Sequence, residues 1–278
     1  MVTLSTFNSA APVLEYPLGA PAARTETGSI YDRVSTARPI INKRERTNHK
    51  PDCRIASSRW EWEAALGLVY RAYVRSGLIR MNRHRMRVTP YHALPTTEVL
   101  IAGNGDEVLC TLSIVGDGQL GLPMEAIYAE EVERRRLQGL RLAEVSCLAD
   151  ERDGSNQSFS MVSRIMALTA QCAVYRGIDQ LLIAVHPRHA KFYKRVIAFE
   201  VIGEERTYAS VCDHPAVALA LDLNNLPFDH PRAYKRLFNV PFDDDLLEYR
   251  PVSHELRSDL RRMAAETYVD QSAALACA

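Results

Sequence analysis

The sequence predicts an α/β protein in which a mixed central β-sheet is flanked by helices. A β-hairpin is predicted around residue 104, a buried strand over residues 180–185, and helical segments between the predicted strands. The strand QLLIAV is nearly all apolar, as is typical of a central strand that is covered on both faces. Helices that alternate with strands in this way indicate a layered α/β domain.

The first predicted elements are a helix and a hairpin. Ser58 and Glu61 form a capping box that begins the helix, and Gly77 is suited to end it. The period then changes to two, and the segments TEVLIA and EVLCTLSIV flank Asn104-Gly105, a strong hairpin turn. The apolar face of the helix consists of Trp62, Leu66, Val69, Tyr70 and Tyr73.

The later elements alternate between helix and strand. A polar helix is predicted over residues 123–137, then the strand AEVSCLA, then a helix from about Gln157 to Tyr175. Pro187 suits the first turn of a short helix, AVALALDL is a further strand, and a last helix is predicted over 254–267.

These elements predict three regions. A flexible or partner-ordered N-terminal arm covers residues 1–52, an α/β domain covers 53–225, and a helical C-terminal extension covers 226–278.

Composition and charge are those of an ordinary globular protein. The chain has 278 residues, of which 47% are hydrophobic and 24% charged, and Lys+Arg balance Asp+Glu at 34 each. This balance and the lack of a recognisable motif argue against a nucleic-acid partner. No apolar run is long enough to cross a bilayer, and no secretory signal is recognisable. Six cysteines lie far apart without a C-x-x-C pair, which indicates reduced thiols, a cytoplasmic location and no metal site.

One predicted strand carries a residue that points to a functional site. Glu144 lies inside AEVSCLA, and burying an unpaired carboxylate is costly, so it needs a partner or a chemical role. Tyr193 lies on the short helix that begins at Pro187. The segment from Gly139 to Glu200, which contains both residues, is the predicted active-site region.

Several separated segments resemble, in order, the long-chain N-acyl amino acid synthases of the FeeM type. These enzymes have the GNAT acyltransferase fold and are relatives of the acyl-homoserine lactone autoinducer synthases. The segments are LPTTEVLIA, TLSIVGDGQLGLPMEAIY, LRLAEVSCLAD, HPRHAKFYKRVIAFEVIGEERTY and HPAVALALDL, within roughly residues 60–225.

The resemblance implies a GNAT-like N-acyltransferase domain over residues 53–225. Its expected reaction moves a long-chain fatty acyl group from an acyl carrier protein thioester to the α-amine of an amino acid. The acyl-phosphopantetheine of the carrier protein would be the donor substrate, with no permanently bound cofactor.

Two departures from related sequences refine this expectation. The loop ADERDGSNQSFS is acidic and has one glycine, so it is poorly suited to bind the diphosphate of CoA on backbone N–H groups. This favours a carrier protein as donor. Cys147 stands where autoinducer synthases carry an arginine after the serine of their E-x-S motif, which argues against chemistry that uses S-adenosylmethionine.

Within this resemblance two residues are candidates for catalysis. Glu144 is expected to be the general base that takes a proton from the acceptor amine, directly or through a water. The alternative is a structural ion pair with an arginine such as Arg141. Tyr193 is expected either to protonate the departing thiolate or to pack its ring against the sheet with its hydroxyl hydrogen-bonded.

The candidate substrate-binding residues are Ser146, Cys147, His186, Arg188 and Met124. Ser146 and Cys147 are successive strand residues, so one is expected to face the cleft and the other the layer behind it. The segment around His186 and Arg188 is expected to contact the pantetheine arm or the acceptor, against the alternative of a satisfied polar residue at a strand end. Met124 is expected to line an acyl tunnel or to pack in the core.

A basic cluster follows the first helix. Arg80, Arg83, Arg85 and Arg87 are predicted to dock the acidic carrier protein. An anchor for the carboxylate of the amino acid and a solvated surface are the alternatives.

Two other functions stay open at this point. One is a CoA-dependent GNAT enzyme that acylates a small amine, against which the acidic loop counts. The other is a degenerate fold kept as a binding or regulatory module, against which Glu144 counts. A weak association with a membrane surface through the product also stays open.

Overall fold

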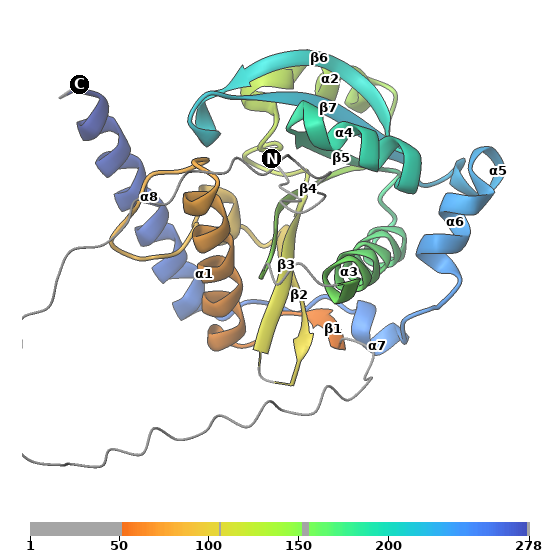
Figure 1. Cartoon of the computed structure of the whole chain (residues 1–278), viewed down its shortest axis with the longest axis horizontal. Helices are drawn as coiled ribbons and strands as arrows, with labels where there is room; N and C mark the ends of the chain where they lie inside the picture. Colours follow the sequence, from red (N-terminus) through yellow and green to blue (C-terminus); the bar gives the residue numbers. More distant parts are fainter. Residues whose placement is uncertain (1–51, 106, 152–155, 277–278) are drawn as a thin grey trace, which may run out of the picture. The chain divides into compact units, whose positions relative to one another are not determined.

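The computed structural model describes residues 52–105, 107–151 and 156–276, with side chains for all of these except 156–159 and 268–276. Within these ranges, seven strands pair in one mixed sheet in the order β1-β2-β3-β4-β5-β7-β6 (Figure 1). β4 and β5 run parallel, and the other neighbours are antiparallel. The strands are β1 (Asp52–Ile55), β2 (Thr97–Asn104), β3 (Glu107–Gly116), β4 (Leu142–Asp150), β5 (Gln180–Val185), β6 (Glu200–Tyr208) and β7 (His214–Asp222). The predicted α/β fold class is confirmed.

The main helices begin and end close to the predicted positions. The capping box of α1 is present, since the Ser58 hydroxyl accepts from the backbone N–H of Glu61 at 3.2 Å and the Glu61 carboxylate accepts from the Ser58 N–H at 3.0 Å. The helices are α1 (Arg59–Arg75), α2 (Glu125–Leu137), α3 (Asn156–Tyr175), α4 (Pro187–Phe192), α5 (Leu226–Asp229), α6 (Pro231–Phe238), α7 (Asp244–Leu247) and α8 (His254–Ala276). Shorter turns are η1 (Pro90–Ala93), the π-helical η2 (Tyr193–Ile197) and η3 (Ala209–Val211).

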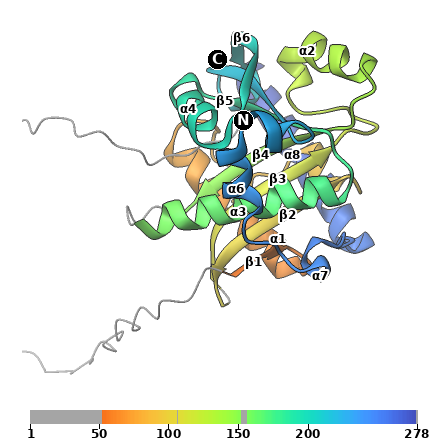
Figure 2. The same cartoon turned by 90° about the vertical axis from the view of Figure 1, so that its right-hand side faces the viewer.

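The helices divide between the two faces of the sheet. α1 and α8 lie on one side and α3 on the other, as Figures 1 and 2 show. Leu181 and Ile183 of β5 pack with α3 and η2, whereas Leu182 and Ala184 pack with α1 and α2. This alternation confirms the prediction that QLLIAV is a central strand buried on both faces.

Helix α8 is held against the protein by apolar contacts. Leu256 and Leu260 of α8 are buried in one cluster with Trp62 of α1, with Val88 before η1 and with Ala93 of η1. The helix extends nine residues beyond the predicted end at 267, and β1 was not predicted at all.

A buried ion pair joins the end of α3 to β2. Arg176 donates to the Glu98 carboxylate at 2.5 Å, and the Glu98 side chain is 5% exposed. Burial raises the pKa of Glu98, and the charge of Arg176 opposes that rise. Removing one partner of such a pair leaves an uncompensated buried charge.

We expect Arg176→Met to lower the free energy of unfolding by about 3–5 kcal/mol, because Glu98 then stays buried without its cation. Urea denaturation followed by circular dichroism measures this change. The double variant Glu98→Gln/Arg176→Met should recover most of the loss. An equal loss in both variants would show that the arginine acts through packing alone.

Candidate active site

Strand β4 separates from β5 within the sheet. The two strands pair only from Leu142↔Gln180 to Glu144↔Leu182, although β4 continues to Asp150. Beyond Glu144, β4 stays paired with β3, and β5 stays paired with β7. The last residue of β4 that pairs with β5 is therefore the buried carboxylate.

A bulge in β4 turns two successive side chains to the same side. Ser146 pairs with Ser113 and Ala149 with Thr111, so β4 has one residue more than β3 in this interval. Cys147 lies in the bulge with φ at 55°, a left-handed conformation. Ser146 and Cys147 consequently both line one pocket. The expectation that only one of them faces the cleft is wrong, because it assumed a regular strand.

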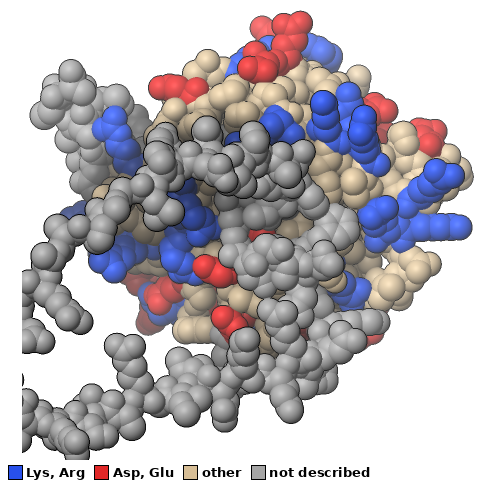
Figure 3. Space-filling view, viewed as in Figure 1, with Lys and Arg blue, Asp and Glu red and all other residues tan. Residues whose placement is uncertain are grey.

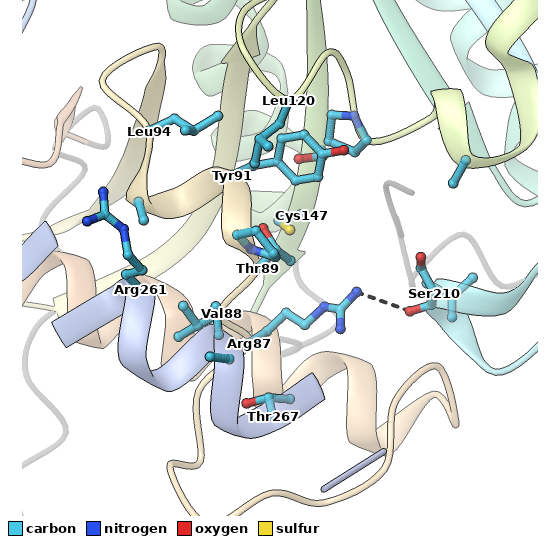
Figure 4. Close-up of a pocket in the computed structure, with 18 of the residues that line it drawn as sticks. Arg87, Val88, Thr89, Tyr91, Leu94, Leu120, Cys147, Ser210, Arg261 and Thr267 are labelled. Carbon is cyan, nitrogen blue, oxygen red and sulfur yellow. Dashed lines mark hydrogen bonds between the residues drawn. The ribbon is translucent and has the colours of Figure 1, made fainter. Parts of the chain in front are cut away.

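The pocket has a volume of about 1010 Å³ and lies between β4, η1, η3 and α8 (Figure 4). Cys147 and Thr89 lie near its centre in the figure, Tyr91 and Leu120 on one side, and Ser210 on another. The lining residues are Tyr73, Arg87, Val88, Thr89, Pro90, Tyr91, Ala93, Leu94, Gln119, Leu120, Pro123, Ala126, Ser146, Cys147, Tyr208, Ala209, Ser210, Val211, Arg261, Ala264, Ala265 and Thr267.

Glu144 lies behind this wall and is fully buried. One carboxylate oxygen, Oε2, accepts from the backbone N–H of Met124 at 2.6 Å. The other, Oε1, has no hydrogen-bond partner among the described residues. Burial raises the pKa of Glu144 to about 7, the Met124 N–H lowers it in part, and Glu125 adds to the rise. The predicted alternative, an ion pair with Arg141, does not form, because Arg141 pairs with Asp179 instead.

Two tyrosines of the pocket wall lie within the electrostatic reach of Glu144. Burial raises the pKa of both Tyr91 and Tyr208, and the charge of Glu144 raises each further. The Tyr208 hydroxyl donates to the Pro123 carbonyl at 2.8 Å, next to the peptide N–H that Glu144 binds. The Pro123–Met124 peptide thus connects the buried carboxylate to Tyr208, which lines the pocket.

Met124 contributes its backbone to the site. Its side chain is fully buried in the core cluster on the α1 and α2 side and does not line the pocket. The packing alternative for this residue therefore describes the structure better than an acyl tunnel. Arg136 holds the loop before α2 by binding both Asp117 and Glu125, which fixes the Met124 N–H.

Tyr193 is placed on the other face of the sheet. Its ring packs edge-on against Phe192 and Phe199 in the core cluster that contains α3, and it is absent from the pocket lining. Its hydroxyl is buried without a hydrogen-bond partner in the described part of the chain, and burial raises its pKa. Of the two alternatives for Tyr193, the packed ring describes its position better, since it lies in a different core cluster from the Glu144 side of the sheet, although the hydrogen bond expected for its hydroxyl is not seen among the described residues.

His186 and Arg188 begin α4 and lie outside the pocket lining. The His186 Nδ1 accepts from the Arg188 backbone N–H at 3.2 Å, so this histidine caps the helix. Burial lowers the pKa of His186, and the charges of Arg188 and His214 lower it further. His186 is thus a satisfied polar residue at a strand end.

The basic cluster after α1 does not form one surface. Arg80 and Arg85 are exposed, and Arg83 pairs with Glu266 of α8 at 2.7 Å. Arg87 points into the pocket, where it donates to the Ser210 carbonyl at 3.1 Å (Figure 4). Its assignment to a docking surface is corrected, because a residue held in the pocket wall is not presented to a partner protein.

Sequence reasoning missed much of the pocket wall. Tyr91, Tyr208, Ser210 and Arg261 come from segments between 91 and 261 that the fold brings together. Of the acidic segment expected to repel CoA, residues 149–150 end β4, residues 156–160 begin α3, and residues 152–155 lie outside the described residues. Among the residues that the structure does describe, no cluster of His, Cys, Asp or Glu could hold a metal ion, and no helix could span a membrane.

The solved structures most informative for this chain are acyltransferases. FeeM, an N-acyl amino acid synthase from uncultured soil microbes, matches with a TM-score of 0.56 and 29% identity, over 63% of this chain and 92% of that one. BjaI, a CoA-dependent acyl-homoserine lactone synthase, matches with a TM-score of 0.52 and 15% identity, over 75% and 99%. The acyl-homoserine lactone synthase LasI matches with a TM-score of 0.50 and 19% identity, over 69% and 97%.

The fold is that of the GNAT-like acyltransferases, and the chain is an acyltransferase of this class. Residues 64–222 match the sequence model of the family described as N-acyl amino acid synthase FeeM, so the chain belongs to the FeeM family. The comparison with curated proteins found no match.

We expect Glu144→Gln to lower the acyl-transfer rate about 10²–10⁴-fold, because glutamine keeps the Met124 hydrogen bond but cannot take a proton. Steady-state rates across pH 5.5–9 measure this. The wild-type rate should rise through about pH 7, where Glu144 ionises, and the residual rate of the variant should lack that step. A variant with near-wild-type turnover would remove Glu144 from the mechanism.

The same substitution should change how stability depends on pH. The folded-state pKa of about 7 exceeds the ordinary value of 4.5, so folding takes up a proton between these values. The stability that this proton contributes is present below pH 4.5 and lost as the pH rises through 7. We expect the free energy of unfolding of Glu144→Gln, relative to that of wild type, to be about 2.5 kcal/mol higher at pH 8 than at pH 5. Urea denaturation at both pH values measures this, and a constant difference would contradict it.

Proposed function

We propose that this protein is an N-acyl amino acid synthase that transfers a long-chain fatty acyl group from an acyl carrier protein to the α-amine of an amino acid. The observation that carries the proposal is Glu144, a fully buried carboxylate beside a pocket of about 1010 Å³, one oxygen of which has no hydrogen-bond partner among the residues that the structure describes. A base that ionises near neutral pH is matched to removing a proton from an ammonium group.

The reaction needs one attack and two proton transfers. The acceptor ammonium loses a proton to Glu144, and the free amine attacks the thioester carbonyl. The C–N bond forms and the C–S bond breaks, which releases the phosphopantetheine thiolate. The second amine proton converts the thiolate to the thiol, and Glu144 returns its proton to solvent, so the products are an N-acyl amino acid, the free carrier protein and one proton. No acyl-enzyme is needed, and Cys147 has no nucleophilic role.

Glu144 does not line the pocket, so the proton needs a group that connects the acceptor amine to the carboxylate. Tyr91 lines the pocket and lies within the electrostatic influence of Glu144. We assign the Tyr91 hydroxyl, or a water beside it, as the connection between amine and base. A Tyr91→Phe variant keeps the ring and removes the hydroxyl, and it distinguishes these two routes by the size of the rate loss.

A surface different from the predicted cluster is suited to dock an acidic carrier protein. Figure 3 shows Lys and Arg side chains gathered over α4 and α6. None of these cations has an ion-pair partner in the described part of the chain, unlike Arg83. The α4–α6 surface consists of the exposed residues Arg188, Lys191, Lys194, Arg195, Arg232, Lys235 and Arg236.

The position of this surface supports its use by the donor. α4 follows β5 directly, at the end where β5 has separated from β4. A carrier protein docked there would hold its pantetheine arm close to the separated strands. Unpaired exposed cations also act over a longer range than arginines already neutralised by carboxylates, and so they accelerate encounter with an acidic partner.

The proposed function is tested by supplying the purified protein with one acyl group on either acyl carrier protein or CoA, together with mixed amino acids. Mass spectrometry should detect N-acyl amino acids, formed faster from the carrier protein. Equal or faster transfer from CoA would show that CoA, and not the carrier protein, is the acyl donor. If the protein is folded and forms no product from either donor, the result would favour the alternative that it is a binding module.

Charge reversal separates the two candidate docking surfaces. We expect Lys191→Glu/Lys194→Glu to raise KM for the acyl carrier protein at least about tenfold and to flatten its salt dependence, since like charges now oppose encounter. Transfer from a short acyl-pantetheine thioester, which needs no docking, should be unchanged.

The matched control is Arg80→Glu/Arg85→Glu, which reverses two exposed charges of the predicted cluster. If this control weakens carrier use instead, docking occurs on the cluster after α1. If both variants keep the wild-type KM, both surfaces are solvated faces without a docking role.

A further inference from the structure

The C-terminal helix α8 forms one wall of the pocket. Arg261, Ala264, Ala265 and Thr267 all line it, and they follow the spacing at which helix residues share one face. The helix is fixed in this place by Leu256 and by the other buried residues that pack on η1. The family match ends at residue 222, so this wall is built from residues outside the matched part.

The pocket is cationic. Among its described lining residues, Arg87 and Arg261 carry charge and no carboxylate is present. In Figure 4 Arg87 points toward Ser210, whereas Arg261 points the other way, toward Leu94. A ligand that fills this pocket therefore meets one arginine near η3 and another beside α8.

Arg87 is held so that it can bind an anion. It is half-buried, and its guanidinium lies over the Tyr73 ring with 6.0 Å between the guanidinium carbon and the ring centroid. One of its donors is used by the Ser210 carbonyl. Its Nε is buried and has no hydrogen-bond partner in the described residues. The Nε is therefore out of reach of a ligand, but the terminal N–H groups that Ser210 does not use can bind the oxygens of a carboxylate.

The space beside α8 suits a side chain. Ala264 and Ala265 are small, and Val88, Leu94 and Leu120 add apolar surface. Arg261 is exposed at this end and places a positive charge there. Apolar walls that end at a cation favour an acceptor with an apolar or acidic side chain and oppose a lysine-like one by charge repulsion.

The geometry points to an acceptor subsite between η1 and α8, in which Arg87 binds the α-carboxylate of the amino acid and α8 selects its side chain. This inference rests on the proposed function. The carboxylate on Arg87 places the adjacent amine toward Tyr91 and the Glu144 side of the pocket. The side chain extends along α8, with Ala265 setting its size and Arg261 its charge.

Size selection is tested with Ala265→Phe. We measure kcat/KM for a panel of amino acids with one acyl donor. The variant should lose about tenfold or more for acceptors with large side chains and keep the wild-type value for glycine and alanine, since only the far end of the subsite is filled. Ser258→Phe is the control, because it adds the same ring on the same helix at a residue that does not line the pocket.

Charge selection is tested with Arg261→Glu. The ratio of kcat/KM for lysine to that for glutamate should rise about tenfold or more, because the charge at the end of the subsite is reversed. Arg134→Glu, an exposed substitution on α2, controls for the change in net charge. Arg87→Gln should raise KM for every amino acid and leave their relative order unchanged, as expected for a common carboxylate contact.

The outcomes separate this inference from the proposed function. If wild type acylates no amino acid, the proposed function fails first. If wild type is active and Ala265→Phe and Arg261→Glu keep the wild-type order of acceptors, α8 does not select the side chain. If Arg87→Gln leaves every KM unchanged, the carboxylate binds elsewhere. Loss of activity with all acceptors in Ala265→Phe but not in Ser258→Phe would place the acyl chain, and not the acceptor, beside α8.

Discussion

The separation of β4 from β5 after Glu144 is the constraint on which the rest of the site depends. A parallel pair that continued to the ends of both strands would close the sheet and cover the backbone of β4. Because pairing stops at Glu144↔Leu182, the later part of β4 is held by β3 alone. The bulge at Cys147 lies in this singly supported part, where one extra residue is tolerated. It turns Ser146 and Cys147 together toward the pocket.

The buried carboxylate belongs to Glu144, the last residue of β4 that pairs with β5. Desolvation of Glu144 is opposed by one backbone N–H, and its second oxygen is left without a described partner. An arrangement optimised for stability would pair both oxygens or replace the carboxylate. The ion pairs of Arg136 with Asp117 and Glu125 fix the loop that supplies the N–H. The protein therefore stabilises the position of Glu144 while leaving its pKa high enough to exchange a proton near neutral pH.

Local signals in the sequence were sufficient for most of the fold. The capping box of α1, the Asn104-Gly105 turn and the apolar run of β5 each act over a few residues, and each is present in the structure. β1 was missed because its four residues pair with Ile101 and its neighbours, some 45 positions later, and four residues carry too little pattern. The site depends more on such distant contacts. A regular strand was assumed through Cys147, since cysteine has no known preference for positive φ, and nothing local indicates that Tyr208 and Arg261 face the same space as Tyr91.

The arginines illustrate why a charge run in the sequence does not define a surface. Four residues that stand within eight positions meet different surroundings: Arg80 and Arg85 meet solvent, Arg83 a carboxylate of α8, and Arg87 an aromatic ring and a carbonyl in the pocket. An exposed unpaired cation is screened by salt and acts mainly on encounter, whereas a half-buried one acts at short range on a bound anion. The cations of the α4–α6 surface are exposed like the first kind, and Arg87 is half-buried like the second. The comparison with FeeM covers 92% of that chain but 63% of this one, so this protein has residues without a counterpart there. Glu144 lies inside the part of the chain that matches the family model and α8 lies outside it, so the pocket combines a wall from the matched part with a wall that the family model does not cover.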